Sequence, residues 1–251
     1  MSPAPVIVTE DLTKIYRHQV AVERLNFTVN EGEIFGFLGP NGAGKTTTLL
    51  MLLGLTEPTR GRARILGIDP AREPIKVKSK VGYLQENMGF YADLTARQML
   101  RFVAELNGIG RRPAEARIEQ ALQDVGLADD DPRKKIAAFS RGMRQRLGIA
   151  ELLIRDSRVA FLDEPTLGLD PDATQRIMEL IQRLAREQGM TILLSSHQLH
   201  QVQKICDRVG IMLRGRLVAD GPIDQLAREK FGVDREEYTL EEIYMKYFLE
   251  G

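Results

Sequence analysis

The chain has 251 residues, of which 43% are apolar and 28% are charged. This composition is typical of a globular protein with a sizeable core, and it excludes disordered chains, collagen and small disulfide scaffolds. Lys+Arg and Asp+Glu number 35 each, so the net charge provides no general attraction to nucleic acid or to an anionic membrane. The longest apolar stretch, residues 49–55, is far shorter than the roughly 18 to 20 residues that cross a bilayer. With no secretory signal at the N-terminus and a single cysteine, Cys206, we expect a cytoplasmic chain.

The spacing of apolar residues divides the chain into three patterns. Residues 6–66 are predicted to form short strands, interrupted by one helix that begins at Gly44 or Lys45. Residues 95–154 have a helical period throughout. From residue 159 onward, apolar strands alternate with helices, which indicates a mainly parallel sheet covered on both faces. The predicted fold class is therefore α/β.

The C-terminal residues 233–251 carry six acidic and two basic side chains. Ile243, Tyr247 and Phe248 recur at helical spacing, which predicts an amphipathic closing helix. We expect this helix to pack on its own domain, and a surface for a partner is the alternative.

A glycine-rich loop lies between an apolar strand, residues 34–38, and an apolar helix, residues 47–53. It satisfies the pattern G-x-x-x-x-G-K-[ST], in which consecutive amide groups and the helix dipole face a polyphosphate. Lys45 is expected to reach the outer phosphates, and the Thr46 hydroxyl is expected to bind Mg²⁺. The residues predicted to bind the nucleotide here are Gly39, Pro40, Asn41, Gly42, Ala43, Gly44, Lys45, Thr46 and Thr47.

A nucleoside triphosphatase also needs an acidic group for the metal. Asp163 and Glu164 directly follow the apolar strand at residues 159–162. Asp163 is placed to hold the Mg²⁺ shell, and Glu164 to accept a proton from the attacking water. The alternative is that both are solvated acids after a strand.

Further markers occur in a fixed order around these two motifs. They are Tyr16, Gln85 after VGYL, FSRGMRQR at 139–146, LGLD at 167–170, and His197 after TILLSS. Together they resemble the ATP-binding subunit of ABC transporters from residue 6 to about residue 220. The resemblance implies a P-loop NTPase in one domain, 1–251: a mainly parallel core with an N-terminal antiparallel β subdomain over 6–94 and 156–220, a helical subdomain over 95–155, and a helical extension over 221–251.

The resemblance also implies roles for three isolated residues. Tyr16 would stack on adenine, Gln85 would link the γ-phosphate and Mg²⁺ to the helical region, and His197 would hold the γ-phosphate and position the water. The alternatives are that Tyr16 is a core tyrosine, Gln85 a surface amide and His197 a structural histidine. His18 and His200 are expected at the surface.

The segment that begins at Phe139 departs from the family's commonest form, Leu-Ser-Gly-Gly-Gln. Ser140 and Gly142 are retained, whereas Arg141 replaces a glycine and Met143 replaces the glutamine. The variant resembles the form found in subunits that serve exporter-like permeases. Ser140, Gly142 and Asp170 are implied to bind ATP, with Ser140 and Gly142 contributed by a second chain.

The resemblance implies that ATP and Mg²⁺ are the cofactors, and that ATP is hydrolysed to ADP and phosphate. The implied partners are a second ATPase subunit, identical or paralogous, and a separate transmembrane permease, which places the chain at the inner face of the cell membrane. Phe90, Tyr91 and Leu94 are candidate permease contacts, although core packing is the alternative. The alternative function is a soluble ABC ATPase acting in translation or on DNA. The balanced charge gives no basic footprint, so no nucleic acid is expected.

Overall fold

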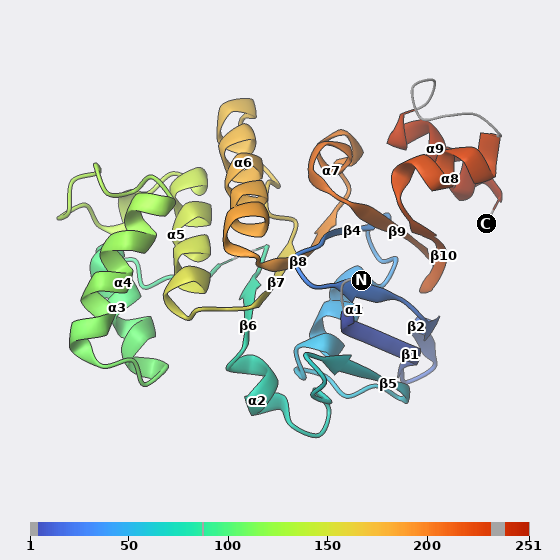
Figure 1. The fold of residues 1–251 in the computed structure, drawn as a ribbon, viewed down its shortest axis with the longest axis horizontal. Coiled ribbons are helices and arrows are strands. Elements are labelled where there is room, and N and C mark those ends of the chain that lie inside the picture. The colour runs from blue at the N-terminus through green and yellow to red at the C-terminus, as the bar shows by residue number, and fades with distance from the viewer. Residues whose placement is uncertain (1–4, 87, 232–238, 251) are drawn as a thin grey trace.

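A computed structural model of the chain describes residues 5–86, 88–231 and 239–250 (Figure 1). The helices and strands of this part, in chain order, are β1 (Pro5–Tyr16), β2 (Gln19–Leu25), β3 (Thr28–Asn30), β4 (Ile34–Leu38), α1 (Lys45–Leu52), β5 (Arg60–Ile65), α2 (Pro74–Lys78), β6 (Val81–Leu84), α3 (Ala96–Leu106), α4 (Arg111–Asp124), a 3₁₀ turn (Ile136–Ala138), α5 (Arg141–Ile154), β7 (Val159–Asp163), α6 (Pro171–Gln188), β8 (Thr191–Ser196), α7 (Leu199–Ile205), β9 (Arg208–Leu213), β10 (Arg216–Gly221), α8 (Ile223–Phe231) and α9 (Leu240–Glu250).

The central sheet has six strands in the order β10-β9-β4-β8-β7-β6. Its neighbouring strands run parallel from β9 through to β6, and β10 joins at one edge as an antiparallel strand. Every residue of β4, β7 and β8 is buried. Strands covered on both faces have continuous apolar sequences, which explains why these three are easy to recognise from the sequence.

Alternate residues along β7 and β8 face opposite sides of this sheet. Phe161 and Leu193 belong to a core cluster shared with α1 and the N-terminal strands. Leu162 and Leu194 belong to a second cluster that contains the buried residues of α5, α6 and α7. Because all the parallel strands point the same way, their carboxyl ends form one edge, at which the loops after β4, β7 and β8 meet.

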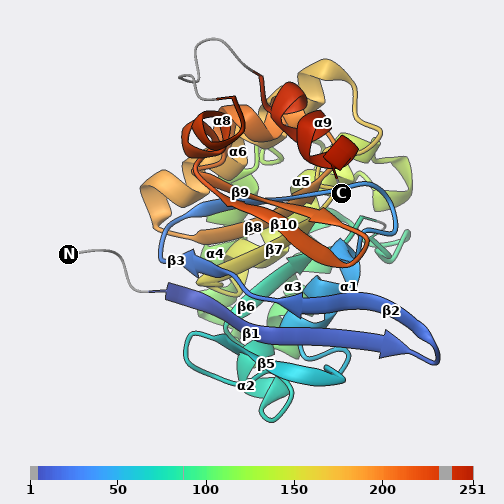
Figure 2. The same cartoon turned by 90° about the vertical axis from the view of Figure 1, so that its right-hand side faces the viewer.

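The N-terminal strands form a separate antiparallel sheet in the order β2-β1-β3, with β5 also paired to β1 (Figure 2). This confirms the predicted antiparallel subdomain. Residues 26 and 27 separate the end of β2 from the start of β3. The division is made by Asn26, whose side-chain amide donates to the Arg24 carbonyl and to Asp11, while its own oxygen accepts from the Asp11 N–H.

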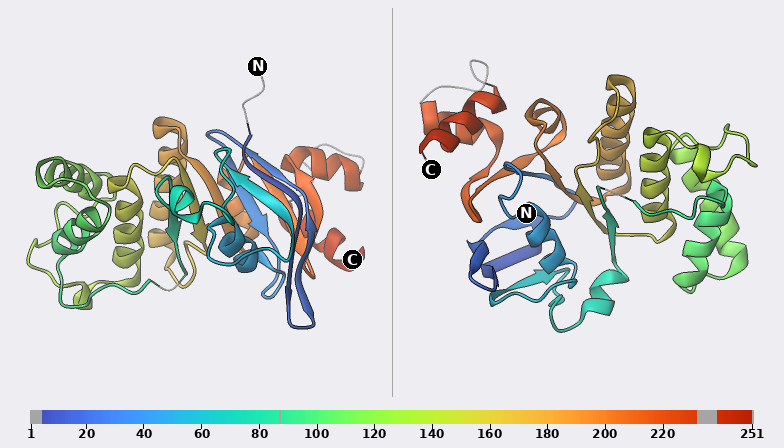
Figure 3. Two further views of the ribbon diagram at one scale, coloured as in Figure 1. Left: turned by 90° about the horizontal axis from the view of Figure 1, so that it is seen from below. Right: turned by 180° about the vertical axis from the view of Figure 1, so that it is seen from behind.

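Helices α3, α4 and α5 gather at one end of the molecule, and α8 and α9 at the opposite end (Figure 3). Helix α3 begins at a capping box made by Thr95 and Gln98. Leu240 and Ile243 of α9 are fully buried, in agreement with the expectation that this helix packs on its own domain. The acidic residues of the preceding segment, 233–238, lie outside the described residues. Within the described part of the chain, no helix combines the length and apolar character needed to span a membrane.

Candidate functional site

The glycine-rich loop connects the buried strand β4 to α1. Gly44 lies just before the helix with φ of +105°, and a Cβ atom there would approach the carbonyl oxygen of Ala21 to 2.5 Å. A Cβ at Gly39 would lie 2.4 Å from the carbonyl oxygen of Met212. Both positions therefore require glycine, because β2 and β9 press against the loop. The constraint holds the backbone of the loop in one path.

This loop forms part of a pocket of about 190 Å³ at the carboxyl edge of the central sheet. The pocket is lined by Gln19, Val20, Ala21, Pro40, Asn41, Gly42, Gly44, Lys45, Thr46, Thr47, Glu86, Asp163 and Glu164. The wall thus combines the first residues of β2, the loop, the start of α1 and the end of β7. Most of the residues predicted from the glycine-rich pattern lie in it together with both predicted acids.

Lys45 is the buried cation of the pocket, with 6% of its surface exposed. Its Nζ donates to the carbonyl oxygens of Gly39, at 2.6 Å, and Pro40, at 3.3 Å, and lies 3.9 Å from Oε1 of Glu164. Burial lowers the pKa of Lys45, and the negative charges of Glu164 and Asp163 oppose that shift. An anionic phosphate near Nζ would favour the charged lysine in the same way.

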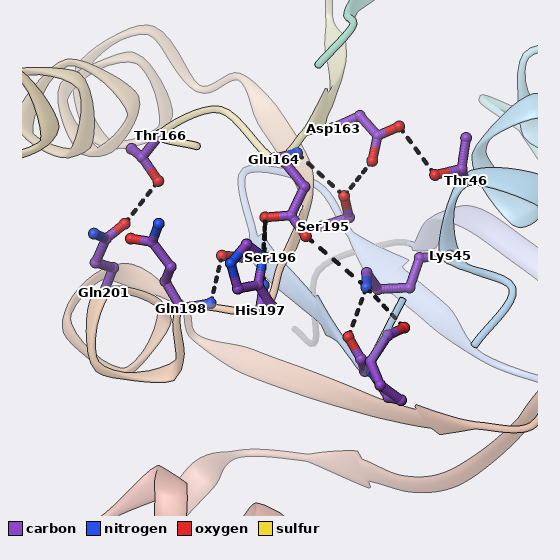
Figure 4. A network of polar contacts seen from close by, with 12 residues as sticks. Lys45, Thr46, Asp163, Glu164, Thr166, Ser195, Ser196, His197, Gln198 and Gln201 are labelled. Atoms are coloured by element: carbon purple, nitrogen blue, oxygen red, sulfur yellow. Dashed lines mark hydrogen bonds and ion pairs between the residues drawn. The ribbon is translucent and has the colours of Figure 1, made fainter. Parts of the chain in front are cut away.

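Asp163 ends β7 and is 5% exposed (Figure 4). Its Oδ2 accepts from the Thr46 hydroxyl at 3.2 Å and from the Tyr83 hydroxyl at 3.5 Å. Its Oδ1 accepts from the Ser195 hydroxyl at 2.5 Å. Burial, together with the adjacent Asp163 carboxylate, raises the pKa of Tyr83, so this phenol stays protonated and donates. Three elements besides β7 therefore fix the carboxylate: α1, β6 and β8.

Glu164 follows directly, with φ of +48°. For a residue other than glycine this left-handed conformation is strained, and it is typical of functional positions. Oε2 of Glu164 lies 2.9 Å from Nδ1 of His197 and also accepts from the His197 backbone N–H at 3.4 Å. The carboxylate is 9% exposed, whereas the His197 side chain is 45% exposed. Glu164 thus lies between Lys45 and a histidine that solvent or substrate can reach (Figure 4).

The Thr46 hydroxyl and the Asp163 carboxylate offer oxygen ligands on one side of the pocket. Mg²⁺ prefers oxygen ligands, and in nucleotide sites it is held by one or two protein groups together with waters and substrate phosphates. The described residues contain no cluster of three or more His, Cys, Asp or Glu side chains that could hold a metal on their own. The donor set fits a Mg²⁺ ion that arrives with a nucleotide.

Ser140 and Asp170 lie in a different pocket, of about 430 Å³, between the starts of α5 and α6. The Ser140 hydroxyl accepts from the Met143 N–H at 3.2 Å, and Oδ1 of Asp170 accepts from the Ala173 N–H at 2.8 Å. Gly142 also lines this pocket. Among the described residues, this pocket and the one at the glycine-rich loop share no lining residue. One chain therefore does not bring Ser140 and Lys45 together.

Two other predicted residues lie near the edge of the first pocket. Tyr16 ends β1, is 44% exposed and pairs with Gln19, which lines the pocket. The exposure excludes the core-tyrosine alternative. Gln85 is exposed directly after β6, and its neighbour Glu86 is the residue that lines the pocket.

Several groups of the site are not marked by any motif in the sequence. Tyr83 and Ser195 both donate to Asp163. Close to the site, the Thr166 hydroxyl donates to Oε1 of Gln201 at 2.7 Å, as a separate pair (Figure 4). The only signal in the sequence is the pair of serines that follows the apolar residues 192–194 in β8. Their partners depend on strand register, which the sequence pattern does not give.

Similarity to known proteins identifies the family of this chain. The sequence profile of the ABC transporter family matches residues 22–167. The bacitracin transport ATP-binding protein BcrA of Bacillus licheniformis is 44% identical over 223 residues, which cover 89% of this chain and 72% of that protein. The chain belongs to the ATP-binding subunits of ABC transporters.

Two further comparisons agree with this membership. The linearmycin resistance ATP-binding protein LnrL of Bacillus subtilis is 35% identical, over 86% of this ABC subunit and 69% of its own length. A solved structure of an ATP binding subunit of an ABC transporter is 32% identical, with a TM-score of 0.86 over 97% of this chain and 99% of that one. The protein is an ABC transporter ATPase, as the ordered motifs indicated.

Proposed function

We propose that this ABC subunit energises export through a separate membrane permease, with Mg²⁺-ATP bound between two ATPase subunits. The observation that carries the proposal is the polar network in which buried Lys45, Asp163 and Glu164 meet exposed Thr46 and His197 at one sheet edge. The residues come from three motifs, which are the glycine-rich loop, the acidic pair after β7 and the histidine after β8, and together they supply the groups that ATP hydrolysis requires.

The proposed chemistry follows from the geometry. The loop amides and Lys45 would bind the β- and γ-phosphates, and Thr46 and Asp163 would hold Mg²⁺, which would neutralise the phosphate charge. Glu164 accepts the proton of the attacking water, because its Oε2 is fixed by His197 and its burial keeps bulk water away. His197, being half-exposed, is free to contact the γ-phosphate with its other ring nitrogen.

The direction of transport is inferred from the relatives. BcrA and LnrL are named for bacitracin transport and linearmycin resistance, and resistance is consistent with outward transport.

Of the three candidate permease contacts, Phe90 and Leu94 pack against the core cluster. Tyr91 is 59% exposed and contacts Phe102 in an edge-to-face arrangement, so its ring is available to a permease. We infer that Tyr91 belongs to the membrane-facing contact.

The chemistry is tested with Glu164→Gln, which removes the base but keeps the shape of the side chain. We expect ATP binding to be retained and turnover to fall by roughly 10² to 10⁴-fold, the usual contribution of a positioned general base. Lys45→Ala should instead weaken ATP binding, because it removes a charge-assisted contact to phosphate. Glu187→Gln, which neutralises an exposed carboxylate near the end of α6, is the matched control and should leave ATP binding and turnover unchanged. Wild-type turnover in Glu164→Gln would exclude the assignment.

The transporter assignment has a separate test. Co-expression with the membrane protein encoded by a neighbouring gene, expected to contain about six apolar segments of about 20 residues, should give a complex that co-purifies and hydrolyses ATP. A chain that binds no such protein and instead binds ribosomes or DNA would contradict the permease proposal.

A further inference from the structure

The hydroxyl of Ser195 lies between the two acidic residues of the site. Ser195 is the penultimate residue of β8, has no exposed surface, and is paired in register with Asp163 of β7. Its Oγ donates to Oδ1 of Asp163 at 2.5 Å and accepts from the backbone N–H of Glu164 at 3.3 Å. One side chain from a neighbouring strand thus contacts both residues (Figure 4).

The contact with Asp163 determines how that carboxylate is turned. Ser195 binds Oδ1 from the β8 side, while the Thr46 and Tyr83 hydroxyls bind Oδ2. Rotation of the carboxylate would break bonds on both sides at once. Asp163 is only 5% exposed, so water does not readily replace a lost donor. Ser195 therefore keeps Oδ2 directed toward Thr46.

The contact with Glu164 supports an unfavourable backbone conformation. The Glu164 N–H is shared between the carbonyl oxygen of Ser195, at 3.1 Å, and its hydroxyl oxygen, at 3.3 Å. The left-handed φ of +48° persists only where the surroundings hold it. This turn is what directs the Glu164 carboxylate toward His197 instead of along the strand.

We propose that Ser195 is a positioning residue for ATP hydrolysis, which orients the Asp163 carboxylate for Mg²⁺ and holds the backbone that aims Glu164. The inference rests on the proposed roles of Asp163 and Glu164. The competing explanation is that the hydroxyl only stabilises the end of β8. Thr191, at the other end of the same strand, makes a comparable contact: it is 1% exposed, and its hydroxyl accepts from the Gly32 N–H at 2.9 Å.

The experiment compares Ser195→Ala with Thr191→Val, since each removes one buried hydroxyl from β8. We expect both to lower thermal stability. Only Ser195→Ala should raise the Mg²⁺ concentration that gives half-maximal turnover, by roughly 10- to 100-fold, as is usual when a group that orients a metal ligand is removed. Ser195→Cys fills nearly the same space with a weak donor and should behave like Ser195→Ala, whereas a pure cavity effect predicts that cysteine restores the wild-type requirement.

A second measurement does not depend on turnover. In a Glu164→Gln background, calorimetric titrations with ATP are made once with Mg²⁺ and once with a chelator. Ser195→Ala should reduce the gain in ATP affinity that Mg²⁺ provides and leave the affinity in chelator unchanged. Thr191→Val should retain the full gain. If Ser195→Ala does not fold, Ser195→Cys is compared with Thr191→Val in the same two assays.

The outcomes separate this inference from the proposed function. Full turnover in Glu164→Gln, or no Mg²⁺-dependent turnover in the wild type, would contradict the catalytic roles themselves. The other outcome is that those roles hold while Ser195→Ala and Thr191→Val need the same Mg²⁺ concentration for half-maximal turnover and gain the same ATP affinity from Mg²⁺. In that case Ser195 is structural, and the inference is overturned.

Discussion

Single side chains at the edge of the pocket have roles that can be tested by truncation. Tyr16 presents a half-exposed ring at the tip of β1, with Nζ of Lys14 4.9 Å from the ring centroid. The ring is therefore not needed for the core, and a base would stack on the face that Lys14 does not cover.

Because stacking recognises the π-face that all bases share, Tyr16→Ala should weaken ATP and GTP binding alike, by about 1 to 3 kcal/mol. Tyr16→Phe keeps the ring and serves as the control, with near wild-type affinity expected. Nucleotide titrations by fluorescence or calorimetry measure the ATP and GTP affinities of the two variants. Unchanged affinity in Tyr16→Ala would show that the ring does not contact the base.

The replacement of a glycine by Arg141 also has a structural explanation at this scale. Gly168 has φ of +70°, and a Cβ atom there would lie 2.8 Å from the Arg141 guanidinium. The arginine therefore packs directly on the Leu-Gly-Leu-Asp turn, where glycine leaves room for it. Met143 is 8% exposed and lines the pocket that contains Ser140.

At the scale of helices and strands, the sequence identifies the buried parallel strands and the long amphipathic helices well. Strands β4, β7 and β8 and helices α3 to α6 follow the predicted segments within a few residues. The short helix α2 was missed, because its five residues lack a clear period and its structure depends on β6, against which it packs. Likewise the motifs locate Lys45, Asp163 and Glu164, whereas Ser195 and Tyr83 enter the site only through strand pairing.

Helix α5 contains a partly buried acid, Glu151, whose charge should affect stability. Burial raises the pKa of Glu151 from 4.5 to about 7, with Arg155 acting in the opposite direction. Its Oε1 has no hydrogen-bond partner among the described residues. In the unfolded chain the same group loses its proton near its ordinary pKa.

Between pH 4.5 and about 7 the folded state therefore keeps a proton that the unfolded state has lost, and stability falls as the pH rises. Because glutamine does not titrate, Glu151→Gln should remove this fall in stability. It should raise the free energy of unfolding by up to roughly 3 kcal/mol above pH 7, and by less at pH 5. Urea unfolding of both proteins at pH 5 and pH 8 measures the difference, with Glu187→Gln as an exposed control. An equal gain at both pH values would show that Glu151 is not the titrating group.

For the whole molecule, the separation of the two pockets has a consequence for assembly. Lys45 lies at the pocket formed by the loop, and Ser140 lies at the other pocket, at the start of α5. We propose that each ATP is enclosed by Lys45 of one subunit and Ser140 of another.

Lys45→Ala and Ser140→Arg should then each fail to form an ATP-bound dimer alone. In a mixed dimer the intact Lys45 of one chain faces the intact Ser140 of the other, so one complete site is restored. Sedimentation of the mixture, with Glu164→Gln in both chains to prevent hydrolysis, should show more ATP-dependent dimer than either variant alone.

The control is a dimer with both substitutions in one chain and none in the other. If each ATP site is built from two chains, both sites of this control dimer are broken. If each site is built within one chain, the unsubstituted chain keeps a whole site. A mixture that dimerises no better than its components, beside a control dimer that does form, would exclude the shared site.

The alternation of side chains along β8 also limits the insertions that this strand can accept during evolution. Ser195 and Leu193 face the side of the sheet that holds α1, and Leu194 faces the opposite layer. Inserting one residue before Ser195 within β8 would transfer its hydroxyl to the opposite layer and bring Leu194 against Asp163, even if the fold survived. Homologous chains should therefore carry no single-residue insertion in β8, and such insertions should be confined to the surface loops on either side of the strand–helix units.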